Sequence, residues 1–463
     1  MEKEKTLETR DGFSSKWGFI LACIGSAVGM GNIWRFPIMV STYGGLTFLI
    51  PYFIFVLLIG ASGVIGEFSL GRVAGAGPIG AFGHCTEKRN GNKTLGQIIG
   101  AIPVIGSMAL AIGYTVVVGW IFKYTFMAIS GGLFKMGTDM NVIGGTFGGT
   151  APETASIGES ISVIFSGAAG NNLWLIIGIV VSLAIMALGI AGGIEKANKI
   201  MMPALFILFV ALAIYIFTLP GASEGYKYIF TLNPAGLLNP KVWIFAFGQA
   251  FFSLSIAGNG TVIYGSYLSK KENVPVSARN VAIFDTLAAL LAAFVIIPAM
   301  AAGGAELSKG GPGLMFVYLV NVFNGMPGGR FVGMVFFICV LFAGVSSLVN
   351  LYEAPVATLQ EKFGFKRVPA VAVIGVIGCI VAVCIQGVTS QWMDAVSIYI
   401  CPLGAMLAGI MFFWVLKKDH ALEAVNEGRD KPIGKWFIPL GKFGLVPLAL
   451  IALIAGAILG GIG

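Results

Sequence analysis

Long apolar runs separated by short polar stretches dominate this chain. An α-helix needs about 20 mainly apolar residues to cross the hydrocarbon core of a bilayer. By that measure the pattern predicts about eleven membrane spans, at residues 17–40, 46–70, 97–127, 172–191, 201–219, 241–267, 277–302, 331–359, 368–386, 392–416 and 436–460. We therefore expect an all-α integral membrane protein with one transmembrane domain over residues 1–463.

The first of these spans is interrupted at its middle by small and polar residues. Gly25, Gly29 and Gly31 are followed by Asn32 and Arg35. Each glycine inside a helix costs roughly 1 kcal/mol relative to alanine. Unwound backbone at membrane depth is tolerated only where it is buried in protein or lines a cavity. A small-residue packing face would explain the glycines alone, but the asparagine and the arginine favour a binding site.

The sixth span repeats this anomaly, since residues 248–261 place Gly, Ser and Asn at its middle. Two interrupted spans, five spans apart, indicate a site between two inverted repeats. Spans 1–5 would form the first repeat, at residues 10–220, and spans 6–10 the second, at residues 240–417. Span 11, at residues 434–463, would be peripheral.

Composition and charge support a membrane protein and set its orientation. The chain is 57% hydrophobic and 11% charged, with a mean hydropathy of +0.90, which no soluble globular class matches. Lysines and arginines gather before the first span and in alternate loops, so these parts are expected to be cytoplasmic. With eleven spans the C-terminus would lie outside a plasma membrane. The net charge of +8 thus indicates topology and not nucleic-acid binding.

The sequence gives little support for catalytic or redox chemistry. The six cysteines have neither metal-ligand nor disulfide spacing, and both histidines fall in predicted loops. Since no nucleophile–base pair or metal-ligand set is visible, the sequence argues against an enzyme.

Several carboxylates lie within predicted spans, among them Glu67 in the second, Asp285 in the seventh and Glu353 in the eighth. A charge at bilayer depth costs about 2.5–3.5 kcal/mol on insertion scales, so each should be buried in protein and hydrogen-bonded. For Glu67 we expect a structural role, accepting N–H groups freed by the unwound first span. One interpretation of Asp285 is likewise structural, with its carboxylate hydrogen-bonded to backbone groups.

Four stretches together resemble the neurotransmitter:sodium symporter family, whose bacterial members carry amino acids. They are Gly25–Pro37, Gln249–Gly260, Gly193–Lys199 with the following Met202-Pro203, and Ala343–Ser347. The resemblance covers about residues 10–415. It implies the leucine-transporter type of fold, an inverted five-helix repeat with broken spans 1 and 6.

The resemblance also implies two sodium sites. The first would use the Ala27 carbonyl, Asn32, Ser253, Asp285 and the carboxylate of the substrate. The second would use backbone carbonyls and two hydroxyls, from Gly25, Val28, Ala343, Ser346 and Ser347. All of these are oxygen ligands, as a hard cation prefers.

Substrate-binding and gating residues follow from the same resemblance. The substrate would meet Ala27, Met30, Gly31, Leu110, Tyr114, Phe252, Ser253, Ser255, Ile256, Gly258, Ser347 and Leu351. Arg35 and Asp394, with Tyr114 and Phe252, would close the outer side. Arg10, Tyr267 and Glu361 would close the inner side, Glu361 being the expected partner of Arg10.

Three departures from the family pattern sharpen the expectation. Asp285 stands where the family usually has Asn, and Ala289 where chloride-dependent members have Ser, so we expect Asp285 to replace chloride as the compensating negative charge. Gly29 stands where amine transporters have Asp, which favours an α-amino acid. Gly258 replaces a bulky residue, which leaves room for a large hydrophobic or aromatic side chain. Eleven spans are predicted, where many members of the family have twelve.

The sequence thus predicts a sodium-coupled symporter that imports an amino acid by alternating access, with two sodium ions and without chloride. A return step with Asp285 protonated would make it a proton antiporter as well. A proton-coupled amino-acid carrier on the same fold, an amino-acid sensor and a channel remain as alternatives.

Overall fold

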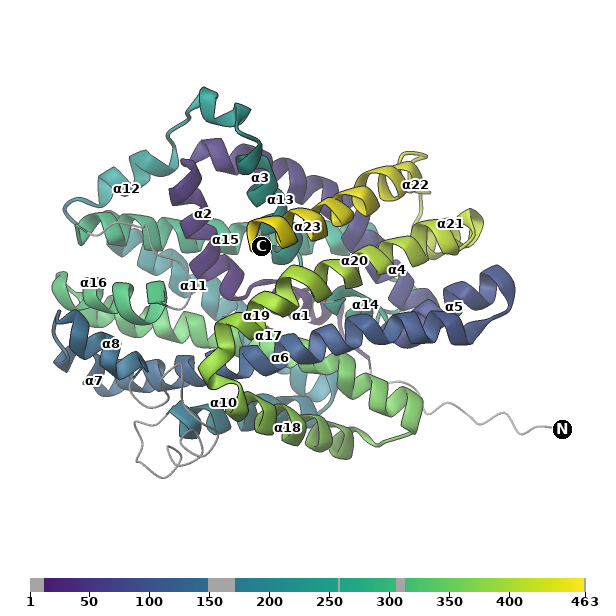
Figure 1. Ribbon diagram of the computed structural model, residues 1–463, viewed down its shortest axis with the longest axis horizontal. Coiled ribbons are helices and arrows are strands. Elements are labelled where there is room, and N and C mark those ends of the chain that lie inside the picture. Colours follow the sequence, from purple (N-terminus) through teal and green to yellow (C-terminus); the bar gives the residue numbers. More distant parts are fainter. Residues whose placement is uncertain (1–11, 149–170, 257–258, 305–312, 462–463) are drawn as a thin grey trace.

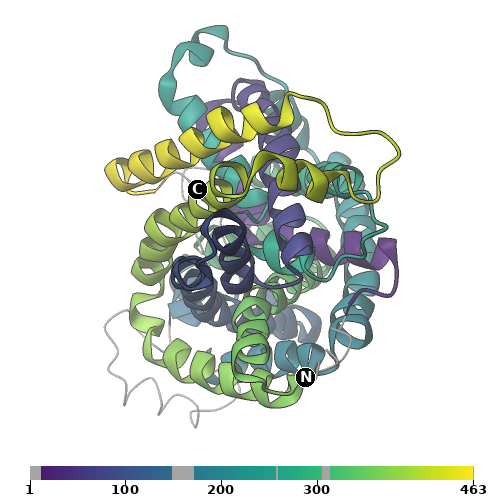
Figure 2. The same ribbon diagram turned by 90° about the vertical axis from the view of Figure 1, so that its right-hand side faces the viewer.

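The computed structural model describes residues 12–148, 171–256, 259–304 and 313–461. All regular elements within these ranges are helices, which confirms the predicted all-α class. The long helices run along the long axis of the molecule, with the short α7, α8, α12 and α16 at one end and α5 and α21 at the other (Figure 1). Figure 2 views the bundle from the end that carries α5 and α21.

Eight of the described helices are long and apolar enough to cross a membrane. They are Leu46–Ala74, Lys93–Ser130, Ile190–Phe217, Val274–Ala302, Gly329–Phe363, Arg367–Cys384, Gln386–Val415 and Phe437–Leu459. Four of them are composite: α3 (Leu46–Ile59), η2 (Gly60–Val64) and α4 (Ile65–Ala74); η4 (Ile190–Glu195) and α11 (Lys196–Phe217); η7 (Gln386–Val388), α19 (Thr389–Ala395), η8 (Val396–Ile400), α20 (Cys401–Ile410) and η9 (Met411–Val415); α22 (Phe437–Leu440), η10 (Gly441–Leu445) and α23 (Val446–Leu459). The others are α6, α15, α17 and α18 in chain order.

The first span is broken, as predicted. Its halves are α1 (Lys16–Ala27) and the pair η1 (Gly31–Arg35) and α2 (Phe36–Tyr43), and they are bent by 58°. Ser15 begins α1 by accepting a hydrogen bond from the Gly18 N–H, as N-cap residues do. With this bent pair, up to nine spans meet the length and composition criteria among the described residues.

The sixth span is broken too, into α13 (Pro240–Ser253) and α14 (Gly260–Gly265). Ser255 and Asn259 have φ values of 58° and 50°, and they are the only non-glycine residues in the described ranges with positive φ. Such left-handed backbone costs on the order of 1–3 kcal/mol and tends to occur at functional sites. The break is therefore held by the surrounding structure.

Two of the eleven expected spans do not meet the span criteria. Residues 172–191 correspond to α10 (Asn171–Ala187), which has 17 residues, and residues 241–267 to the interrupted α13 and α14. The number eleven therefore remains a prediction. The remaining described helices are α5 (Pro78–Asn90), α7 (Gly132–Lys135), α8 (Met140–Gly148), α12 (Ala222–Ile229), η5 (Pro234–Leu238), η6 (Leu314–Tyr318), α16 (Leu319–Gly325) and α21 (Lys418–Asn426).

Residues 193–199 fall between the predicted spans 172–191 and 201–219, so the sequence predicts a charged turn there. This prediction is wrong, because these residues lie inside the helix Ile190–Phe217. The chain turns earlier, at Gly189, where φ is 89°. Glu195 can be buried in the helix because Lys199 pairs with it at 2.6 Å and both Ser14 and Ser15 donate to its carboxylate.

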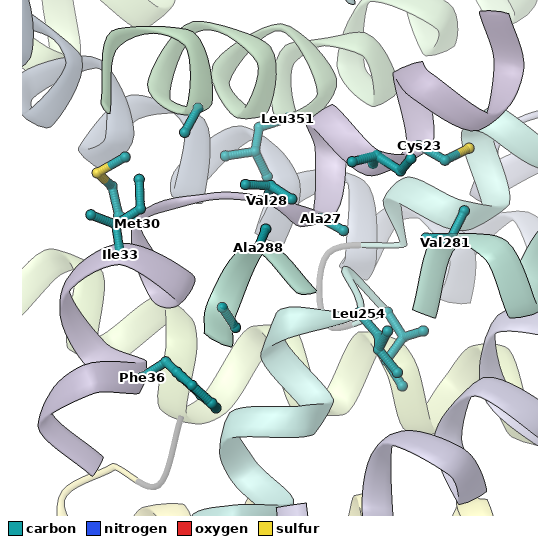
Figure 3. Close-up of a cluster of buried hydrophobic side chains, with 14 of the residues drawn as sticks. Cys23, Ala27, Val28, Met30, Ile33, Phe36, Leu254, Val281, Ala288 and Leu351 are labelled. Atoms are coloured by element: carbon teal, nitrogen blue, oxygen red, sulfur yellow. The ribbon is translucent and has the colours of Figure 1, made fainter. Parts of the chain in front are cut away.

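Both broken spans lie inside the bundle. The half-helix α1 packs against α11 and α17, α2 against α15, α13 against α3, and α14 against α4. Figure 3 shows buried apolar side chains on both sides of the first break, with Cys23, Ala27 and Val28 before it and Met30, Ile33 and Phe36 after it. Because protein covers both half-helices around the break, its free backbone groups face a cavity and not lipid.

Candidate functional site

A cavity of about 510 Å³ lies between the two breaks, α6, α17 and the span that contains Asp394. Ten of the twelve predicted substrate residues line it: Ala27, Met30, Gly31, Leu110, Tyr114, Phe252, Ser253, Ser255, Ser347 and Leu351. Ile256 is buried beside the break, and Gly258 lies outside the described residues. The fold thus gathers residues from six separate parts of the sequence around one cavity.

One wall of the cavity is the unwound part of the first span. The Met30 N–H donates to the Tyr114 hydroxyl at 2.8 Å. At Gly29, a Cβ atom would lie 2.8 Å from the Tyr114 hydroxyl and 3.0 Å from Ser347 Oγ, whereas a Cβ at Gly31 would meet nothing within 4 Å. The chain therefore passes close to α6 and α17 at Gly29 and faces open space at Gly31.

Ser255 connects the two breaks directly, since its hydroxyl donates to the Ser26 carbonyl at 2.9 Å. Gln249 adds a second link, because its amide donates to the Gly31 carbonyl at 3.1 Å. The two unwound segments therefore form one unit.

Asn32, Ser253 and Asp285 form a hydrogen-bonded group beside the cavity, which we call the acidic cluster. Ser253 Oγ lies 2.6 Å from Asp285 Oδ2. The Asn32 amide lies 2.8 Å from Asp285 Oδ1 and 3.2 Å from Ser253 Oγ. All three side chains are buried, so a negative charge on Asp285 requires a compensating positive charge nearby. Its oxygen donors fit a hard cation such as sodium.

A second group, which we call the neutral cluster, joins the first span to α17. Ser347 Oγ lies 3.3 Å from the Gly25 carbonyl and 3.2 Å from the Val28 carbonyl. Ser346 Oγ lies 3.1 Å from the Ala343 carbonyl. These five predicted ligands thus come together as a set of oxygens without a carboxylate, which again fits a hard monovalent cation.

The expected outer-gate pair lines the same cavity. Arg35 and Asp394 both face it, and no direct ion pair joins them within the described ranges. Arg35 Nε is buried without a hydrogen-bond partner. Tyr114 and Phe252, the other expected gate residues, line the same cavity.

At the inner side, the hydrogen-bonded residue is Glu353, which was not among the predicted gate residues. Tyr267 donates to Glu353 at 2.7 Å, and Arg367 binds both carboxylate oxygens of Glu353 at 2.7 Å. Glu361 accepts the Gly77 N–H at 3.0 Å, while Arg10 lies outside the described residues. Glu353 was visible as a buried acid in a span, but its pairing with Arg367 depends on a helix turn that the sequence pattern does not specify.

Glu67 is buried, as expected, but it contacts the other break. Asn259 Nδ2 donates to its Oε1 at 3.2 Å, and the Thr261 hydroxyl donates to its Oε2. The carboxylate therefore bonds side chains at the break of the sixth span, and the expectation that it would accept N–H groups of the first span is wrong. Asn259 has a left-handed backbone, and this contact helps to hold it.

Sequence reasoning missed Asn350. This residue of α17 is buried, lines the cavity, and its Oδ1 has no hydrogen-bond partner. A Cβ at Gly260 would lie 2.5 Å from its Nδ2. Its position three residues after Ser347 was the available signal, since both fall on one helix face.

Residues 10–137 and 156–456 match the profile of the Sodium:neurotransmitter symporter family. The chain belongs to this family. It is 32% identical to an uncharacterized sodium-dependent transporter of Methanocaldococcus jannaschii, over 96% of this chain and 90% of that protein. It is 30% identical to the sodium-dependent neutral amino acid transporter B(0)AT3 of Mus musculus, over 63% of this chain and 48% of that protein.

Among solved structures, the chain is similar to MhsT in complex with L-phenylalanine, with a TM-score of 0.79 and 34% identity. The similarity covers 96% of this chain and 99% of MhsT. The predicted leucine-transporter fold is thereby confirmed. The protein is a multi-pass membrane transporter of a sodium-dependent family and not an enzyme.

Proposed function

We propose that this transporter imports a large hydrophobic or aromatic amino acid together with two sodium ions, without chloride. The observation that carries this proposal is the joining of both breaks and both oxygen clusters around one cavity. The cavity wall offers backbone groups near Met30 and Gly31, and the Tyr114 hydroxyl, to a substrate carboxylate. N–H groups at the start of a half-helix suit a carboxylate because of the helix dipole.

The steric surroundings of Gly29 support an amino acid over an amine. No side chain fits there without displacing Tyr114 or Ser347, so the chain offers no carboxylate at this position to a substrate ammonium. The zwitterion would instead contribute its own carboxylate to the acidic cluster. Leu110, Phe252 and Leu351 give the cavity an apolar wall for a large side chain.

The acidic cluster supports chloride independence. Asp285 occupies a fully buried place between Ser253 and Asn32, where its carboxylate would balance the charge of the enclosed cations. Buried charge without compensation is very costly.

The energetics allow concentrative import. At a membrane potential of about 100 mV each sodium contributes roughly 2.3 kcal/mol, and a tenfold gradient adds about 1.4 kcal/mol. Two ions would supply roughly 7 kcal/mol, enough for about a 10⁵-fold accumulation. We place the transporter in the plasma membrane, with the N-terminus cytoplasmic and the C-terminus outside, as the lysine and arginine bias favours.

Uptake of labelled amino acids into proteoliposomes tests this function. An inward sodium gradient should drive accumulation of leucine, phenylalanine, tyrosine or tryptophan, and an equimolar potassium gradient should not. Replacement of chloride by gluconate should change the rate by less than about twofold. Displacement of the label by glycine or alanine in preference to the large amino acids would contradict the substrate class. Uptake that follows pH and ignores sodium would support proton coupling instead.

A further inference from the structure

A second cavity, of about 650 Å³, lies between the second and seventh spans and shares no lining residue with the first. Its walls are residues 53–65 of the composite helix Leu46–Ala74 and residues 275–287 of α15. The lining is apolar except for Arg279 and Thr286. Leu57 is 73% exposed and Ile283 49% exposed, so this groove opens to the surroundings of the bundle.

The floor of the groove is closed by direct contact between the two helices. A Cβ at Gly60 would lie 3.4 Å from the Ala282 Cβ, and Ala61 lies beside it in the lining. Gly60, Ala61 and Ala282 are smaller than neighbours such as Leu57 and Ile283. They therefore leave a groove on the surface while the two spans stay in contact. A helix with its side chains is about 10–12 Å across, too thick to enter between spans in contact, whereas a single hydrocarbon chain is not.

The length of the groove matches one leaflet of a bilayer. Each wall covers a rise of about 18 Å along its helix, at 1.5 Å per residue. One half of a bilayer's hydrocarbon core is about 15 Å thick. An acyl chain that entered at one membrane surface would therefore lie along most of the groove.

The chemistry at one end selects the headgroup. Pro275 and Arg279 lie in the first two turns of α15, which begins at Val274. Arg279 is exposed and has no ion pair in the described part of the chain, and the exposed Lys270 and Lys271 precede it in sequence. A guanidinium group binds phosphate oxygens in a two-pronged arrangement. This end is the cytoplasmic one in the proposed orientation.

We propose that this groove binds an anionic glycerophospholipid of the inner leaflet, with one acyl chain between spans two and seven and the headgroup phosphate on Arg279. The bound lipid would bridge both helices and stabilise their contact at Gly60 and Ala282. This site is separate from the sodium and substrate sites, so the proposal stands or fails independently of the transported substrate.

Native mass spectrometry of the purified transporter tests this site, with phosphatidylglycerol or phosphatidylcholine of identical acyl chains added at equal concentrations. We expect roughly fivefold more retained phosphatidylglycerol, since one basic residue near a membrane surface contributes about that preference. Arg279→Gln should abolish the preference. Ala61→Phe should fill the groove and lower retention of both lipids.

Two matched variants control for general effects. Arg89→Gln removes another exposed cytoplasmic-side arginine, and Ala211→Phe adds a ring to an exposed position of α11; both should retain lipid as the unmodified protein does. Equal retention of the two lipids, or a preference that survives Arg279→Gln, would overturn the proposal. So would a dimer that Ala61→Phe converts to monomer, because a second copy would then be the occupant.

Discussion

The two oxygen clusters differ in charge and in their relation to the cavity. The acidic cluster holds the buried Asp285 and adjoins the cavity through Asn32 and Ser253. The neutral cluster holds only carbonyls and hydroxyls, and Ser347 ties it to the first span. From this difference we propose that the acidic cluster couples a cation to the substrate through charge, and that the neutral cluster couples a cation to the position of the first span.

This comparison predicts that substitutions in the two clusters reduce uptake for different reasons. Loss of the carboxylate should remove charge compensation for the cations and the substrate together. Loss of a hydroxyl from the neutral cluster should weaken the binding of one sodium ion without removing charge compensation.

The largest effect is expected for Asp285→Asn. Removing one partner of a buried charged group costs roughly 3–5 kcal/mol, so sodium-driven uptake should fall by on the order of 10²–10⁴-fold in chloride-free buffer. Addition of chloride should restore part of it, because an anion could then supply the lost charge. The measurement is initial uptake in proteoliposomes, with Asp419→Asn on the exposed part of α21 as the control. Full activity of Asp285→Asn without chloride would mean that the carboxylate compensates nothing.

A smaller effect is expected for Ser347→Ala, which removes a hydroxyl within reach of two carbonyls. A hydrogen-bonding contact to a charged group contributes about 1.5–3 kcal/mol, so the sodium concentration for half-maximal uptake should rise at least about tenfold. The effect should be the same with and without chloride. Thr358→Ala is the matched control, because that hydroxyl bonds to Ala354 within α17. An unchanged sodium dependence would exclude the neutral cluster as a cation site.

Glu67 sharpens the comparison because it is a second buried carboxylate without a proposed cation. Glu67→Gln keeps the size of the side chain but weakens its bonds to Asn259 and Thr261. We expect a loss of roughly 1–2 kcal/mol of stability, seen as a lower melting temperature in detergent, with the sodium dependence of uptake unchanged. If the half-maximal sodium concentration instead rises as in Ser347→Ala, Glu67 acts on the cations and our structural assignment fails.

Much of this organisation could be predicted from the sequence, because interruptions in apolar spans have few physical explanations. The breaks near Gly29 and Asn259 were visible as small and polar residues at membrane depth. The pairing of Glu67 with Asn259 could not be predicted. It depends on which of the two broken spans packs against the second span at Glu67, and the sequence pattern does not give that. Likewise, Glu195 sits in a helix and not in a turn because Ser14 and Ser15, 180 residues away, satisfy its carboxylate. Such long-range partners leave no periodic signal.

We propose that Asn350, which lies one helical turn after Ser347 of the neutral cluster, contacts the substrate side chain in the cavity. Its buried amide lacks a partner for Oδ1, and a rotation of the amide plane would present either end to a ligand. Tyrosine and tryptophan carry a hydrogen-bond donor on their rings, whereas phenylalanine and leucine do not. A neutral hydrogen bond contributes about 0.5–1.5 kcal/mol, or roughly 2- to 12-fold.

The smallest effect is therefore expected for Asn350→Leu, as a change in ranking and not a loss of transport. Uptake of tyrosine and tryptophan should fall relative to phenylalanine and leucine by that factor. The melting temperature should hold or rise, because removal of an unsatisfied buried polar group is favourable. Competition against labelled phenylalanine measures the ranking, with Val117→Leu, an apolar change in the same cavity wall, as the control. An equal loss for all four amino acids would show that Asn350 shapes the cavity without distinguishing side chains, and would leave specificity to the apolar wall alone.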